Sequence, residues 1–362
     1  MLDIRCGPWN NVAAMGIYAA LLRPLLFLLP PEKAQASAEW LLKRHGLWHA
    51  LSPLLDYHDP RLRVEAGGLV FPSPVGLAAG LDKDCEFLAA LQDIGFGYAV
   101  GGTVVPRPRD GNPKPRLMRL PTQASLINAL GFPSLGMTAV QRNLERLRHL
   151  KRHAAKPVIA SVAGLSLEEF LECHATLEPL ADATELNISS PNTQGIRIFQ
   201  EAQNFKTLLE HINAQRKKPL WVKIPPYADN QGRDHVLTLV RLAKEHGVNA
   251  VTASNTKPVE ALQLAPGRGG LSGRSVFDDT LRIVPEVRAE AGHSMSVNAC
   301  GGIATAEDAL RALKAGANTV QLLTAMVYQG PSVVGRINRG LVRLMEKQGA
   351  GSIQELARAT VP

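Results

Sequence analysis

The sequence has 362 residues, of which 45% are hydrophobic and 20% are charged, and its formal net charge is +8. This composition indicates a packed globular protein, and the length suits one large barrel with an appendage or two ordinary domains. The excess positive charge fits a solvated surface, an anionic substrate, a phosphate-bearing cofactor or an acidic membrane surface. Nucleic acid is not expected as a partner, because no run of Lys and Arg with interleaved aromatic residues occurs.

The four cysteines, Cys6, Cys85, Cys173 and Cys300, lie far apart in the sequence. No pair forms a CxxC motif, so we expect no metal centre and a reducing environment. The N-terminus shows no evident cleavable signal peptide.

The apolar run Ile17–Leu29 carries Arg23 and Pro24 at its middle. A helix that spans a bilayer needs about 20 apolar residues, so this run is too short. Helical spacing continues from Glu32 to Arg44 and is predicted to end at Gly46. We therefore expect residues 1–60 to form a helical hairpin with an apolar groove for a membrane or an apolar ligand. The alternative is a hairpin that only caps the rest of the protein.

The remainder of the chain predicts an α/β fold. The segment Leu62–Phe71 alternates around Gly67-Gly68 and predicts a β-hairpin. Eight short apolar runs then alternate with amphipathic helical stretches, a pattern typical of the (β/α)₈ TIM barrel. An open doubly wound sheet is the alternative, but no GxGxxG motif opens its first unit. We expect the barrel at residues 61–345 and a tail at 346–362, with strands near Val75–Ala79, Tyr98–Val104, Pro157–Val162, Thr184–Ile188, Leu220–Ile224, Ala250–Ser254, Ser296–Cys300 and Thr319–Leu323.

Small and polar residues follow nearly every predicted strand, at the end of the barrel where active sites lie. Lys83 offers a positive charge beside small residues that let a flat ligand approach. Asn187 and Asn192 can each donate to and accept from a planar ligand. Ser190 between them has no GxSxG elbow and no evident His–Asp partner, which argues against a hydrolase. Gly301-Gly302, Thr324 and a predicted loop at Gly269–Gly273 indicate a phosphate site.

Five motifs together resemble the dihydroorotate dehydrogenase family, especially its quinone-linked, membrane-associated class. They are Gly76–Asp84, Gly102–Leu120, Ile127–Phe132, Asn187–Gly195 and Gly269–Arg274. The resemblance covers about residues 15–340. It implies FMN as cofactor and a reaction in which Ser190 removes a proton from C5 of dihydroorotate while C6 gives a hydride to flavin N5.

The resemblance also implies the residues that hold each ligand. Lys223 would stabilise the reduced flavin, and backbone amides would hold the phosphate. Residues 192–199 would form a lid, with Thr193 on a proton path. The implied cofactor contacts are Ala79, Gly80, Lys83, Thr103, Ser161, Asn187, Lys223, Ser254, Gly273, Gly302, Leu323 and Thr324. The implied substrate contacts are Lys83, Asn128, Phe132, Asn187, Asn192, Asn255 and Thr256.

Some positions depart from the quinone-linked pattern. Ser161–Leu165 on the third strand resembles the soluble classes, Gln35 stands where a histidine is usual, and Leu323 stands where a tyrosine is usual. Serine at 190 agrees with the quinone-linked class, which implies a membrane quinone as acceptor, reached through the N-terminal helices with Arg119 near the inner end of the tunnel. That class also implies peripheral attachment to the cytoplasmic face of the membrane, and we expect a monomer.

Three other hypotheses remain open. The protein could be a flavin barrel oxidoreductase that acts on another planar pyrimidine. It could use an acceptor other than quinone. It could also be a membrane-docked binding protein that has kept the barrel without the chemistry.

Overall fold

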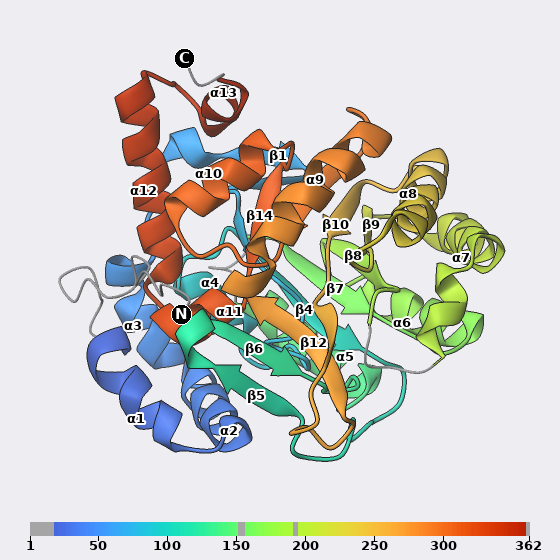
Figure 1. The fold of residues 1–362 in the computed structure, drawn as a ribbon, viewed down its shortest axis with the longest axis horizontal. Helices are drawn as coiled ribbons and strands as arrows, with labels where there is room; N and C mark the ends of the chain where they lie inside the picture. Colours follow the sequence, from blue (N-terminus) through green and yellow to red (C-terminus); the bar gives the residue numbers. More distant parts are fainter. Residues whose placement is uncertain (1–17, 151–155, 191–194, 360–362) are drawn as a thin grey trace, which may run out of the picture.

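The computed structural model describes residues 18–150, 156–190 and 195–359, and its centre is a closed barrel of eight parallel strands (Figure 1). All eight predicted strands are present, with ends that differ from the prediction by at most two residues. The sequence therefore predicted the (β/α)₈ fold correctly. In barrel order the strands are β3 (Val75–Leu77), β4 (Tyr98–Val104), β7 (Val158–Val162), β8 (Ala183–Asn187), β9 (Leu220–Lys223), β10 (Ala250–Ala253), β13 (Ser296–Cys300) and β14 (Thr319–Leu322).

Helices surround the barrel and cover its outer face (Figure 1). Each turns an apolar stripe inward; on α5, for example, Val140, Leu144 and Leu147 are buried. The surrounding helices are α4 (Leu88–Asp93), α5 (Met137–His149), α6 (Leu167–Leu177), α7 (Ala202–Gln215), α8 (Asn230–Glu245), α9 (Phe277–Ala291), α10 (Ala306–Lys314) and α12 (Val333–Gln348), with short helices η7 (Ile196–Gln200), η8 (Arg274–Val276) and α11 (Thr324–Gln329) in the loops.

The predicted hairpin is present as β1 (Val64–Ala66) and β2 (Leu69–Phe71), an antiparallel pair. It closes the end of the barrel where the strands begin. The Phe71 ring lies 4.5 Å from that of Tyr98, and the Trp221 indole donates a hydrogen bond of 2.9 Å to the Gly67 carbonyl. This aromatic plug makes the base of the barrel solid, so a ligand can enter only from the opposite end.

A second sheet was not predicted. It contains four antiparallel strands in the order β11 (Lys257–Glu260), β12 (Arg268–Gly273), β6 (Ser125–Asn128) and β5 (Leu117–Leu120). The prediction of a loop at Gly269–Gly273 was therefore wrong. Glycine and serine have low strand propensity, but here neighbours on both sides satisfy the backbone groups of β12.

The N-terminal segment differs from the predicted hairpin of two helices. It contains η3 (Tyr18–Leu22, a π-helix), α1 (Arg23–Leu28), α2 (Pro31–Leu42) and α3 (His45–Leu55), followed by η4 (Pro60–Leu62). Gly46 lies inside α3 and does not end a helix. The third helix forms because Trp48 is buried in the main core, where its packing outweighs the low helix propensity of glycine. No helix in the described part of the chain is long and apolar enough to cross a bilayer.

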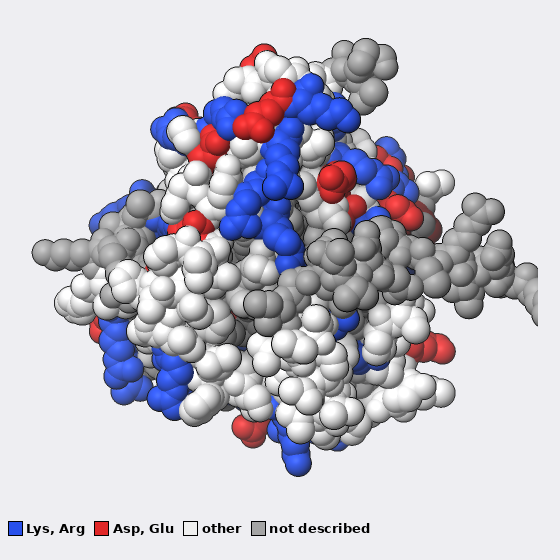
Figure 2. Space-filling view, turned by 90° about the vertical axis from the view of Figure 1, so that its left-hand side faces the viewer, with Lys and Arg blue, Asp and Glu red and all other residues white. Residues whose placement is uncertain are grey.

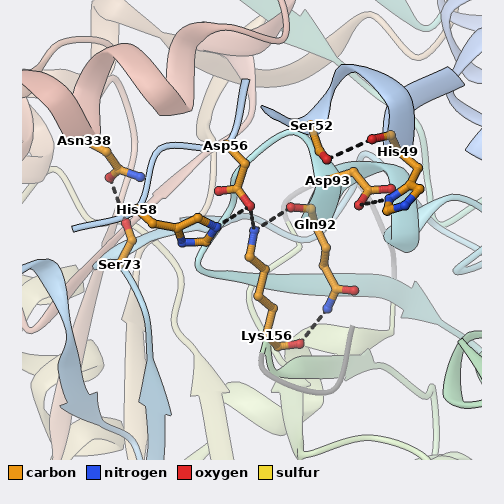
Figure 3. Close-up of polar contacts among 9 residues, drawn as sticks. All are labelled: His49, Ser52, Asp56, His58, Ser73, Gln92, Asp93, Lys156 and Asn338. Carbon is orange, nitrogen blue, oxygen red and sulfur yellow. Dashed lines mark hydrogen bonds and ion pairs between the residues drawn. The ribbon is translucent and has the colours of Figure 1, made fainter. Parts of the chain in front are cut away.

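A polar cluster fixes the end of α3 to the barrel (Figure 3). The Lys156 ammonium donates to the Asp56 carboxylate at 2.5 Å and to the backbone carbonyl of Gln92 at 2.7 Å. The side-chain amide of Gln92 donates in turn to the backbone carbonyl of Lys156. The His49 ring lies 3.6 Å from Asp93. The side chains of Lys156 and Asp56 are only 11% and 13% exposed. Asp56 also contacts the His58 ring at 2.9 Å, so removing Asp56 is the change that would leave the Lys156 ammonium without a counter-charge, at a cost of about 3–5 kcal/mol.

The end of the chain forms a further short helix. Residues Ile353–Arg358 form α13, which Ser352 caps by accepting a hydrogen bond from the Glu355 amide. Ile353 and Leu356 are buried. Part of the segment predicted as a tail is therefore packed against the protein.

Candidate active site

A cavity of about 680 Å³ opens at the end of the barrel where the strands finish. Its floor consists of residues that follow the barrel strands, and its side walls come from the four-stranded sheet. Its outer part runs between η3, α1 and α2, where the lining is mainly leucine, alanine and aromatic side chains. One continuous space therefore connects a polar pocket over the barrel to an apolar channel through the N-terminal helices.

The polar floor is connected by hydrogen bonds. The Asn187 amide donates to the Thr103 hydroxyl at 2.7 Å, and the Ser161 hydroxyl lies 3.1 Å behind Thr103. On its other side, Asn187 accepts from the Ser189 hydroxyl at 2.7 Å, and Asn255 donates to Ser189 at 2.8 Å. These bonds fix the orientation of Asn187 and Asn255, so their remaining polar atoms have defined directions.

Ser190 lies directly after this network, at the end of β8, and lines the cavity while being almost fully buried. A buried hydroxyl at a cavity wall can exchange a proton with a ligand without contact with bulk water. The predicted partners on the following loop, Asn192 and Thr193, lie outside the described residues.

Two lysines line the polar pocket. Lys223 at the end of β9 is buried, and its nearest hydrogen-bond partner among the described residues is the Cys300 sulfur, 3.9 Å away. No carboxylate of the described residues pairs with Lys223. Burial lowers the pKa of Lys83, and Glu39 is the neighbouring charge that opposes this shift most. Both cations therefore favour anionic ligands.

The loop that carries Lys83 is held by the buried Asp82. Its carboxylate accepts hydrogen bonds of 2.8 Å from the amides of Glu86 and Phe87. Burial raises the pKa of Asp82 to about 7, and the two amide bonds oppose that shift. These bonds stabilise the turn that brings Lys83 over the barrel.

Two glycines shape the pocket beside α11. Gly302 has φ +72°, and a Cβ there would lie 2.6–2.7 Å from atoms of Phe277. Gly273 has φ +91°, and a Cβ there would lie 2.5 Å from the Ala124 carbonyl oxygen. Neither position tolerates a side chain, so backbone groups are exposed to the cavity. Such surfaces, next to a helix N-terminus, are suited to phosphate.

Two arginines, Arg119 on β5 and Arg23 on α1, hold the apolar channel in place. The Arg119 guanidinium donates to the carbonyls of Leu26 and Leu29 and lies 4.6 Å from the Phe27 ring centre. The Arg23 guanidinium donates to the Tyr328 carbonyl at 3.1 Å. Gln35 and Leu323, the two departures noted in the sequence, both line the cavity.

Most residues predicted from the sequence do meet in this cavity. Of those that the structure describes, all except Ser161 are among its lining residues, and Asn192 lies outside the described residues. Ser161 is fully buried behind Thr103, so it can act on a ligand only through that residue.

Sequence reasoning missed Gln321, Cys300 and Glu39. Gln321 is buried on β14 and lines the cavity, and its side chain lies close to the Tyr98 hydroxyl. A glutamine in an otherwise apolar strand was a usable signal. Within the described part of the chain, no group of His, Cys, Asp or Glu could hold a metal ion.

These features define a class of protein: a barrel enzyme whose pocket suits a planar, phosphate-bearing cofactor and opens into an apolar channel. The family model described as dihydroorotate dehydrogenase matches residues 61–345, so the chain belongs to the dihydroorotate dehydrogenase family. Enzymes of this family are flavin-dependent oxidoreductases.

Relatives and a solved structure agree with this assignment. A Thermus thermophilus protein named dihydroorotate dehydrogenase (quinone) is 41% identical over 351 residues, which is 92% of this chain and 99% of that protein. A Roseiflexus protein of the same name is 37% identical and covers 93% of this chain and 96% of its own. The crystal structure of DHODH in complex with ferulenol from Eimeria tenella has a TM-score of 0.81 at 27% identity, covering 92% of this chain and 97% of that one.

Proposed function

We propose that this protein oxidises dihydroorotate to orotate in pyrimidine biosynthesis, with FMN as cofactor and a membrane quinone as electron acceptor. The observation that carries this proposal is the single cavity that joins a polar pocket to an apolar channel. A polar substrate and an apolar acceptor could then reach the same cofactor from different sides.

The pocket fits FMN by the chemistry of its lining. Lys223 has no carboxylate partner among the described residues, so it offers a positive charge to a reduced, anionic flavin ring. The buried side-chain amide of Gln321 lines the pocket and offers a further donor and acceptor. The glycine-lined surface at Gly273 and Gly302, with Thr324, suits the phosphate. Ala79, Gly80, Thr103, Ser254 and Leu323 would contact the remaining cofactor surface.

Bound FMN supplies an acceptor for hydride, and the residues of this chain prepare the substrate to give it. Lys83 binds the carboxylate of dihydroorotate. Asn128, Asn187, Asn255 and Thr256, together with Asn192, hold the alternating carbonyl and N–H groups of its ring. Phe132 excludes water. Ser190 then accepts the proton from C5, which requires that its hydroxyl proton leave by another path.

The N-terminal helices suit peripheral attachment to the membrane, and we place that attachment on the cytoplasmic face. Leu25 and Leu28 on α1 are 63% and 82% exposed, and Trp40 on α2 is 60% exposed. On the face in Figure 2, Lys and Arg gather in a stripe across the upper half, and the centre of the lower half is mostly white, with Lys and Arg at its edges. An apolar surface beside basic residues favours an interface with anionic lipid.

Anaerobic mixing tests substrate and acceptor together. Dihydroorotate should bleach the flavin absorbance of the purified protein, and quinone should restore it faster than fumarate or NAD⁺ does. No bleaching would contradict the substrate assignment, and faster recovery with fumarate or NAD⁺ would contradict the acceptor assignment.

A further inference from the structure

Glu39 is the only carboxylate among the described residues that line the cavity. It lies on α2, which forms a wall of the apolar channel, and it is half-buried. The Gln35 amide, one turn earlier, donates a hydrogen bond of 2.7 Å to its Oε1 atom. The carboxyl group is thereby oriented within a channel lined mainly by apolar side chains.

From this position we propose that Glu39 is the catalytic acid that protonates the quinone during its reduction. The proposal rests on the function proposed above. A quinone takes a hydride, which is two electrons and one proton, from the singly deprotonated reduced flavin. The second proton comes from Glu39: an O–H bond breaks at its carboxyl group and one forms on the quinone oxygen. The flavin is left oxidised, the product is hydroquinone, and the Glu39 carboxylate regains its proton from water.

The other acidic groups of the channel are poorly suited to this step. Tyr18 donates its hydroxyl proton to the Val327 carbonyl and Tyr328 donates to the Ser125 carbonyl. Burial raises the pKa of both phenols, that of Tyr328 to about 12. Burial also raises the pKa of the Cys300 thiol. Each of these groups releases a proton less readily than a carboxyl group does.

The charges around Glu39 leave it available. Lys43, the residue that caps the end of α2, is paired with Glu86 at 2.6 Å. Glu32, at the start of the helix, accepts from the Arg116 amide at 2.9 Å and does not line the cavity. Among the charges around Lys83, Glu39 raises the pKa of that lysine most, and Arg116 lowers it. Partial exposure lets Glu39 exchange protons with solvent, while the rest of its side chain lies in the channel.

The test separates the two halves of the reaction in the flavin-loaded protein. The variants are Glu39→Gln, which keeps the shape without an ionisable proton, and Glu39→Asp, which keeps the acid. Glu32→Gln is the matched control on the same helix. Stopped-flow absorbance follows flavin reduction by dihydroorotate, then reoxidation by a saturating short-chain benzoquinone or by ferricyanide, which takes electrons without a proton.

For Glu39→Gln we expect quinone reoxidation to slow by about 10²-fold, which is within the usual contribution of a general acid. Reduction by dihydroorotate and reoxidation by ferricyanide should stay at wild-type rates, and Glu39→Asp should recover part of the loss. The dissociation constant of the quinone, measured by quenching of tryptophan fluorescence, should not change. Glu32→Gln should match the wild type in every measurement.

Several results would overturn the proposal. Wild-type quinone rates in Glu39→Gln would exclude a proton-transfer role. A slower reduction by dihydroorotate would show that Glu39 acts on Lys83 instead. An increase in the quinone dissociation constant large enough to explain the slower reoxidation would make Glu39 a binding residue. If quinone fails to reoxidise the wild-type protein, the proposed acceptor is wrong, and the proposed role of Glu39 is then wrong as well.

Discussion

At the scale of single residues, the pocket combines groups whose properties depend on burial. Ser190 and Lys223 are almost fully enclosed, and Asn187 is fixed by bonds to Thr103 and Ser189. Serine is a weak base in water, so its chemistry here depends on a cavity that limits access of solvent. The consequences can be measured one side chain at a time.

Ser190→Ala should remove the base and leave the cofactor in place. We expect the flavin content to stay near one per chain, because Ser190 is not among the expected flavin contacts. Flavin reduction by dihydroorotate should slow by about 10²–10⁴-fold, the usual range for general base catalysis. Stopped-flow absorbance measures that rate, and a wild-type value would exclude Ser190 as the base.

Lys83 should make substrate binding dependent on pH. Burial lowers the pKa of its ammonium group, so the group loses its proton at a lower pH than an exposed lysine does. Only the protonated form attracts the substrate carboxylate, and the KM for dihydroorotate should therefore rise as the pH increases through this lowered pKa. Lys83→Met should have a high KM with no such rise; a parallel rise in that variant would assign the effect to another group.

At the scale of elements, loops at the ends of the strands determine the shape of the pocket. The turn after β13 carries Gly301 and Gly302, and the end of β12 carries Gly273, all with positive φ. A side chain at Gly302 or Gly273 would collide with backbone atoms of neighbouring elements. The elements are thus packed so closely that only bare backbone faces the ligand.

Gly302→Ala should therefore impair FMN binding. Its Cβ would lie 2.7 Å from the Phe277 Cα, so the loop must move away from α9. Gly267→Ala is a matched control, since Gly267 has φ +68° and nothing within 4 Å of its Cβ position. We expect a lower flavin-to-protein absorbance ratio in Gly302→Ala only. Equal losses in both variants would point to backbone strain as the cause.

At the scale of the whole molecule, the N-terminal helices extend the barrel outward. Arg119 attaches α1 to β5 and Arg23 attaches it to α11. The cluster around Asp56 and Lys156 fixes the end of α3 (Figure 3). Between these attachments, α1 and α2 carry leucine and tryptophan side chains exposed to solvent. The same helices form the channel wall on their inner side. The surface suited to the membrane and the entrance to the cavity are therefore formed by the same two helices.

Replacing Leu25 and Leu28 together by Glu should weaken binding to vesicles of anionic phospholipid. Burial of one leucine side chain contributes about 1.5–3 kcal/mol, so the loss should be at least about tenfold. Flavin reduction by dihydroorotate should be unchanged, because neither side chain reaches the polar pocket. Vesicle sedimentation measures the binding. Leu262→Glu, at a position that is 85% exposed and outside these helices, should bind as the wild type does.

The sequence by itself determined the barrel and most of the pocket. Eight continuous apolar runs that alternate with amphipathic helices indicate parallel strands buried on both faces, and in a barrel the residues after each run meet at one end. Local signals were sufficient for the strands and for the turn at Gly67-Gly68, because both depend on neighbouring residues. Contacts such as Asn128 and Phe132 were implied by the family resemblance.

Only the tertiary structure decided the rest. The strand at Arg268–Gly273 exists because β6 and β11 pair with it, and α3 exists because Trp48 packs into the core. Tertiary packing also places Ser161 behind Thr103, away from the cavity, and places Gln321 and Glu39 among the residues that line it. These outcomes depend on contacts between segments far apart in the chain, and local pattern carries no record of such contacts.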